Sequence, residues 1–134
     1  MRAGGINWLA VIAAAVAVYA IGFIIYGMVI PEDRMIAMTG MTEADVAVAE
    51  SRMALGILMP LATALFLAVL FKWGGVQTIS RGAQWAAVVA LASAIPTVWY
   101  GFVYGGLPAE MSVMDSAHLL LGHVAAGAIL GGWR

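Results

Sequence analysis

Cysteine is absent from the 134-residue sequence, and charged residues make up only 10% of it. Without cysteine the chain has no disulfide, no thiolate nucleophile and no cysteine-ligated metal site. Soluble domains carry about 25% charged residues. This chain therefore has too little polar surface to cover a globule in water, and we expect lipid to solvate it. The net charge of −1 provides no excess of basic residues to neutralise phosphates, which argues against nucleic acid as a partner.

Hydrophobic residues, in contrast, make up 64% of the sequence and gather in four long runs. A helix needs about 20 apolar residues to cross the hydrocarbon core of a bilayer, and each run is close to that length. The first run continues to Ile30, too far for the ~7–15-residue core of a signal peptide. We therefore predict an all-α membrane protein, a single transmembrane domain over residues 1–134, whose four transmembrane helices form an up-down-up-down bundle. The predicted helices cover about residues 6–30, 42–71, 83–104 and 113–133.

The few charges are divided unequally between the two ends of these helices. Four basic residues lie at the termini and in the middle loop without any acid, namely Arg2, Lys72, Arg81 and Arg134. The other two loops hold all seven acids and the remaining basic residues, Arg34 and Arg52. Because cytoplasmic loops carry an excess of Lys and Arg, this distribution predicts that both termini are cytoplasmic.

Start signals locate two of the predicted helices more closely. Thr42 followed by Asp45 resembles a capping box, and no glycine or proline interrupts the chain from there to Gly56. The second helix is therefore expected to start near Thr42 and to extend ~15 Å beyond the bilayer at 1.5 Å per residue. Ser112 with Asp115 provides the same signal for the fourth helix. Since the middle loop is short, the second and third helices are expected to be antiparallel neighbours.

Several short motifs together resemble a known family. They are the opening INWLAV, the Tyr26–Gly27 pair that ends the first run, GMTEAD, Pro96 in the third run, and the closing HLLLGHVAAGAILGGW. Across nearly the whole chain the sequence is similar to domain-of-unknown-function family 1761, a family of small bacterial four-helix membrane proteins. The resemblance implies a four-helix fold and a place in the bacterial inner membrane, and it implies no activity.

Small residues recur at every fourth position on two of the predicted helices. In lipid, helices associate by close backbone approach over small side chains rather than by a hydrophobic effect. These faces are interpreted as contacts inside the bundle, because four helices must bury some such faces. The functional alternative is an interface with a second copy or another membrane protein, for which the candidates are Gly56, Ala64, Ala68, Gly127 and Gly131.

Two prolines interrupt the second and third runs, and each removes one backbone hydrogen bond. Counting 1.5 Å per residue places Pro60 and Pro96 about 10 Å below the outer surface, with His123 at a similar depth. His123 is expected to face the bundle interior, because its ring nitrogens would lack partners in hydrocarbon. There it can bond to a tyrosine or threonine hydroxyl, or to a carbonyl freed by a proline. These residues and their neighbours are interpreted either as packed kinks or as a cavity for a small apolar or amphipathic ligand. The candidate ligand-binding residues are Tyr19, Pro60, Pro96, Thr97, Tyr100 and His123.

Catalytic and metal-binding patterns are weak. The two histidines, His118 and His123, are five residues apart and face different sides of a helix, so they do not form a haem site. Asp115 and His118, with Glu110, are the one group of metal-ligating residues near the outer surface, and a capped, solvated helix start is the simpler interpretation. We predict no metal, no cofactor and no enzymatic activity.

The leading hypothesis is a non-catalytic integral membrane protein that acts by association. It would be an accessory or assembly subunit of a larger membrane complex, or a small homo-oligomer, with the lipid bilayer as its surroundings. The four apolar runs, residues 6–30, 53–71, 83–103 and 116–133, contain no charged residue. This absence supports the hypothesis, because ion-coupled carriers place such residues at mid-membrane. The alternative is a binder or carrier of a small apolar or amphipathic ligand at the layer around His123.

Overall fold

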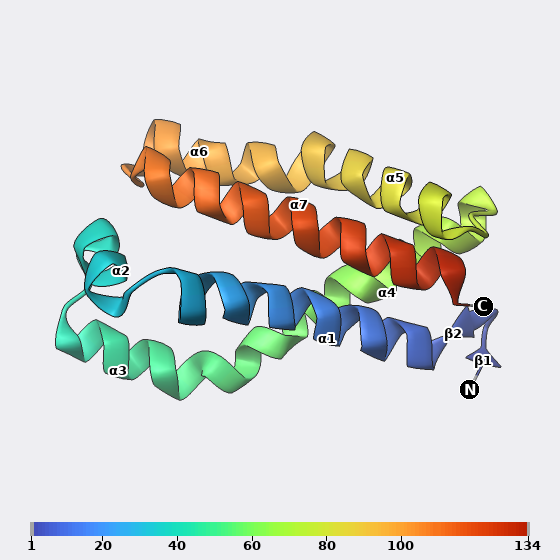
Figure 1. The fold of residues 1–134 in the computed structure, drawn as a ribbon, viewed down its shortest axis with the longest axis horizontal. Coiled ribbons are helices and arrows are strands. Elements are labelled where there is room, and N and C mark those ends of the chain that lie inside the picture. Colours follow the sequence, from blue (N-terminus) through green and yellow to red (C-terminus); the bar gives the residue numbers. More distant parts are fainter. Residues whose placement is uncertain (1, 134) are drawn as a thin grey trace.

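The computed structural model describes residues 2–133, which are almost entirely helical (Figure 1). Arg134, which entered the charge distribution, lies outside the described residues. Two short strands at the N-terminus, β1 (Arg2–Ala3) and β2 (Ile6–Asn7), pair antiparallel. Gly4 and Gly5 form the turn between them, both with positive φ, which a residue without Cβ adopts without strain. This small hairpin was not predicted.

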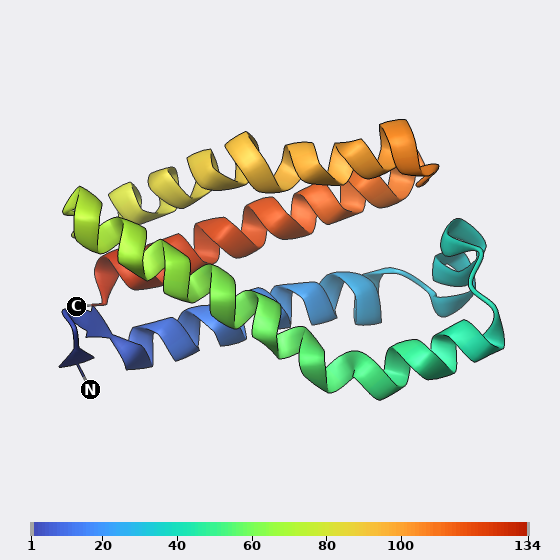
Figure 2. The same cartoon turned by 180° about the vertical axis from the view of Figure 1, so that it is seen from behind.

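Within residues 2–133, four stretches are long and apolar enough to cross a membrane, which confirms the predicted all-α membrane fold. They are Trp8–Val29, Glu43–Gly74, Ile79–Gly105 and Ala109–Gly132. Both described ends of the chain lie at one end of the molecule, beside the turn that joins the second and third stretches (Figures 1 and 2). The alternating direction of the helices across a bilayer stays a prediction.

Several of these stretches change helical type along their length. The elements are α1 (Trp8–Ile24), the π-helical turn η1 (Ile25–Val29), α2 (Glu32–Thr39), α3 (Glu43–Arg52), the 3₁₀ turn η2 (Met53–Ile57), α4 (Leu58–Gly74), α5 (Ile79–Val89), the π-helical turn η3 (Ala90–Ala94), α6 (Ile95–Gly105) and α7 (Ala109–Gly132). The turns η2 and η3 precede Pro60 and Pro96, because a helix that loses a backbone donor adjusts its hydrogen-bond spacing nearby. Helix α2 was not predicted.

The capping box at the start of α3 is confirmed. The Thr42 hydroxyl accepts from the Asp45 amide at 3.3 Å, and the Asp45 carboxylate accepts from the Thr42 amide at 2.9 Å. From there the chain stays helical to Gly74, as predicted for a long second helix. The start expected near Ser112 was wrong, because α7 begins at Ala109, directly after Pro108.

Helix α7 is the central element of the bundle and packs against α1, α4, α5 and α6. The core gathers in the half of the molecule that holds the termini, where Val11 of α1, Leu67 and Phe71 of α4, and Leu130 of α7 are buried together. Helices α4 and α5 were expected to be direct neighbours, and this was wrong. Each packs on α7 instead, with little contact between the two.

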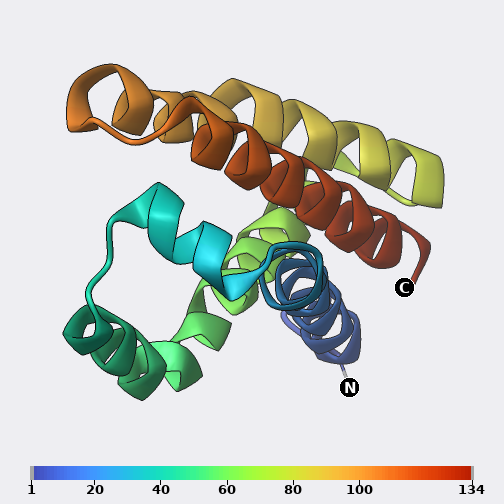
Figure 3. The ribbon, with the colours of Figure 1, turned by 60° about the vertical axis from the view of Figure 1, so that its left-hand side comes forward.

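In the other half of the molecule the helices diverge. Helix α3 lies apart from α6 and α7 (Figures 1 and 3). Successive apolar side chains between Met53 and Met59 are exposed, and Met59 reaches 73%. A helix with apolar side chains on every exposed side is solvated by lipid or covered by another apolar surface.

Candidate functional site

His123 faces the bundle interior, as predicted, and its exposed fraction is 7%. Its Nδ1 lies 2.7 Å from the carbonyl oxygen of Leu119, one turn earlier on the same helix. A tyrosine, a threonine or a carbonyl freed by a proline was the expected partner, and that expectation was wrong. The carbonyl of its own helix is simply nearer, because residues four apart lie on one helix face.

This hydrogen bond determines the chemistry of the other ring nitrogen. A carbonyl oxygen only accepts, so Nδ1 carries the proton, and in the neutral ring Nε2 is an acceptor. Among the described residues Nε2 of His123 has no hydrogen-bond partner, yet it is not one of the fully buried unpaired atoms. The atom therefore reaches the molecular surface.

The surface that His123 reaches is the wall of a groove of about 310 Å³ between α4 and α5. Helix α4 contributes Ala62, Thr63, Phe66, Leu67 and Leu70, whereas α5 contributes Val89. The groove exists because α4 and α5 both pack on α7 and have little contact with each other. Except for Thr63 and His123, its lining is apolar, and His123 is the residue that α7 contributes.

The other predicted ligand-binding residues are not brought together with His123. Pro60 is buried in α4 outside the groove lining. Tyr19 lies beside Gly56, where a Cβ would stand 3.8 Å from the tyrosine ring. Pro96, Thr97 and Tyr100 lie on exposed surface of α6, where the Tyr100 ring stacks on that of Tyr104. Counting residues along a helix gives depth but not rotation about the helix axis, and rotation separates these side chains.

The candidate interface residues are largely used within the chain. A Cβ on Gly127 would stand 2.3 Å from the Gly82 carbonyl oxygen, and a Cβ on Gly131 would stand 2.4 Å from the Thr78 carbonyl oxygen. The interpretation of this face as a contact inside the bundle is therefore confirmed, and the partner is α5. Of the remaining candidates, Ala64 is fully buried, Ala68 packs against the core, and Gly56 is half-buried.

Gly82 was missed in the sequence, although a signal for it existed. Gly82, Ala86 and Ala90 are all buried and recur at every fourth position, the same spacing that pointed to Gly127 and Gly131 on α7. Two helix faces whose small residues have the same spacing can contact each other along several turns. The faces of α5 and α7 do so here.

A second polar cluster joins the C-terminal end of the first span to the N-terminal half of α7. The Tyr26 hydroxyl, in turn η1, donates to the Asp115 carboxylate. The Tyr26 ring also meets the His118 ring edge-on, with centroids 5.4 Å apart. Nε2 of His118 is buried without a partner among residues 2–133, and a Cβ on Gly22 would stand 2.9 Å from it. Unlike His123, this imidazole is packed against backbone and faces no groove wall.

The residues considered for a metal have other partners here. Glu110, in the first turn of α7, pairs with Arg34 of α2, and both side chains are largely exposed. Asp115 accepts from Tyr26. Residues 2–133 contain no cluster of three or more histidine or carboxylate side chains that could hold a metal ion. These contacts tie α7 to α1 and α2 instead.

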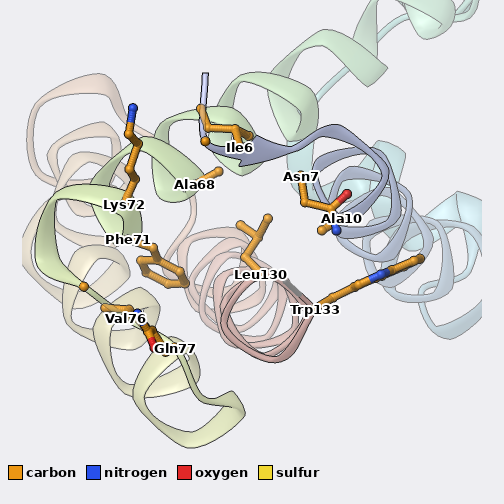
Figure 4. A pocket seen from close by; sticks show the side chains of 12 residues that line it. Ile6, Asn7, Ala10, Ala68, Phe71, Lys72, Val76, Gln77, Leu130 and Trp133 are labelled. Carbon is orange, nitrogen blue, oxygen red and sulfur yellow. The ribbon is translucent and has the colours of Figure 1, made fainter. Parts of the chain in front are cut away.

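A separate cavity, of about 220 Å³, lies at the end of the molecule that holds the termini (Figure 4). The Phe71 ring and Leu130 form its apolar part, and Trp133 lies at its edge (Figure 4). Lys72 extends away from these side chains (Figure 4), and its ammonium donates to the Gly4 carbonyl at 2.7 Å. The lysine thereby fastens the N-terminal hairpin to α4.

Comparison with known proteins adds one match. A family model described as "Protein of unknown function (DUF1761)" covers residues 9–131. No curated protein and no solved structure matches the chain.

Proposed function

The chain belongs to the DUF1761 family, whose function is unknown, and from its own geometry we propose that it is a non-catalytic membrane protein that binds a small amphipathic ligand. The observation that carries this proposal is the groove at His123. There, His123 is more than nine-tenths buried, its Nε2 has no partner among the described residues, and it lines a wall that is apolar except for His123 itself and Thr63. Small-molecule sites have this composition, mostly apolar with a few placed polar groups, and volumes of about 300–1,000 Å³.

The route to the groove is the bilayer itself. Its walls belong to α4, α5 and α7, which are parts of three candidate membrane spans. Phe66, which is 71% exposed, stands on the open side of the groove, whereas Leu67 is buried at its inner side. A ligand that already resides in the lipid phase reaches His123 without crossing water, and this favours an apolar molecule with a small polar group.

We place the protein in the bacterial inner membrane with both termini cytoplasmic. The excess of Lys and Arg at the termini and in the middle loop supports this orientation. The common position of both chain ends and the α4–α5 turn at one end of the molecule is consistent with it.

Association with another membrane protein, or with a second copy, is the second candidate function. The hypothesis that the small-residue faces form this interface loses support, since Gly127 and Gly131 already lie against α5. The apolar segment from Met53 to Met59 favours it instead, because its large side chains stay exposed in the described part of the chain. Crosslinking in native membranes from a single cysteine introduced at Met59 tests this candidate: a dimer or a heterologous adduct supports it, and only monomer refutes it.

The ligand-binding proposal is tested by filling the groove. Ala62→Phe places a ring among the groove residues, whereas Ala20→Phe puts the same ring on an exposed position of α1 outside the groove. Protein extracted in mild detergent is examined by native mass spectrometry for bound small molecules. We expect an adduct on the wild type and on Ala20→Phe that Ala62→Phe lacks. The same adduct on all three proteins, or none on the wild type, would refute the proposal.

A further inference from the structure

The ligand groove contains two polar side chains with unused hydrogen-bonding capacity. The Thr63 hydroxyl has no hydrogen bond among the described residues, and the same holds for Nε2 of His123. Resting on the proposed function, we infer that the ligand is a neutral bilayer-resident alcohol or phenol, whose hydroxyl group donates to Nε2 of His123 and accepts from Thr63.

The donor requirement follows from the tautomer of His123. Its Nδ1 proton is engaged by the Leu119 carbonyl at 2.7 Å. Nε2 of the neutral ring can therefore only accept, and the ligand group that meets it has to bring a proton. Ketones, esters and ethers lack that proton, so they leave Nε2 unpaired in an apolar groove, which is unfavourable.

The absence of charge on the ligand follows from the groove lining. Apart from His123, which the Leu119 carbonyl holds with its proton on Nδ1, no residue that lines the groove is acidic or basic. A cationic ligand would find no counter-ion there, and an anionic carboxylate would present only acceptors to the acceptor Nε2. A hydroxyl group is neutral and both donates and accepts, which matches one acceptor nitrogen and one threonine hydroxyl.

His118 shows why the inference concerns His123 alone. Both histidines lie on α7 and each has an unpartnered Nε2 within residues 2–133. The Nε2 atom of His118 is fully buried against Gly22, so no ligand reaches it. His123 lines a groove of about 310 Å³, and its Nε2 is not among the fully buried unpaired atoms.

The experiment compares two probes of the same chain length, one with a hydroxyl proton and one in which a methyl group replaces that proton. Radiolabelled 1-dodecanol and its methyl ether are bound at equilibrium to the full-length protein in phosphatidylcholine nanodiscs, with empty nanodiscs subtracted. We expect the wild type to bind the alcohol about fivefold more tightly than the ether, the factor for one neutral hydrogen bond. His123→Leu should remove this preference while it continues to bind the ether, and His123→Gln, which keeps an acceptor, should restore part of it.

Thr63→Val should lower the preference for the alcohol, and Thr39→Val, the same exchange on α2 far from the groove, should not change it. If His123→Leu does not fold, the wild-type probe pair and Thr63→Val decide the inference. Equal binding of both probes to the wild type, lost in Ala62→Phe, would overturn the hydroxyl assignment and leave the groove function standing. No saturable binding of either probe would overturn both.

Discussion

Gly82 of α5 and Gly127 of α7 hold the backbones of their helices in direct contact: a Cβ built on Gly82 would stand 2.1 Å from the Gly127 carbonyl oxygen. This crossing draws α5 onto α7 and away from α4, although a short turn joins α4 to α5. The groove at His123 results from this arrangement of the helices, because it is the space that remains between α4 and α5.

Gly127→Ala should destabilise the protein strongly. The added methyl would meet a backbone carbonyl, which cannot rotate aside, so α5 and α7 have to separate. Overpacking of this kind costs about 1–3 kcal/mol or more. Gly105→Ala is the matched control, since nothing lies within 4 Å of a Cβ there. The melting temperatures of both variants are measured by thermal unfolding in detergent. Equal melting temperatures would contradict the prediction and show that α5 and α7 can move apart at Gly127 without loss of stability.

Tyr26→Phe should also lower stability, because it leaves the partly buried Asp115 carboxylate without its donor. Loss of such a partner costs about 1–3 kcal/mol. Tyr104→Phe, at a residue 80% exposed, should have little effect in the same unfolding measurement. Were the two variants equally stable, the bond between η1 and α7 would contribute nothing to the fold.

Thr42→Ala should fray the start of α3 without unfolding the bundle. The substitution removes the side-chain half of the capping box, a loss of about 0.5–2 kcal/mol, and α3 has no buried residue to compensate. Hydrogen exchange of the amides from Glu43 to Ala47 should accelerate. Ser51→Ala, which removes a hydroxyl at the other end of α3, serves as the control, and unchanged exchange in Thr42→Ala would contradict the prediction.

The orientation predicts the outcome of reporter fusions. A reporter joined after Arg134 should be active only if it functions in the cytoplasm, and one inserted at Thr39 only if it functions outside. An external C-terminus would invert the assignment of every loop. It would leave the groove unaffected, because the groove is defined by helix contacts rather than by orientation.

The sequence by itself determined the membrane class, the four spans and the start of α3 at Thr42. Each of these depends on properties of neighbouring residues, namely hydrophobicity summed over about 20 positions and a cap formed within one turn. The interior position of His123 was also predictable, since a polar ring in a membrane helix avoids lipid.

Only the tertiary structure decided which faces meet. The bond from Tyr26 to Asp115 joins residues 89 positions apart, and the Gly82–Gly127 contact selects α5 rather than α4 as the closest neighbour of α7. Repeated small residues allow several pairings and rotations of the helices at similar local cost. The packing of all four spans together selects one of them, and with it the side chains that share a groove with His123.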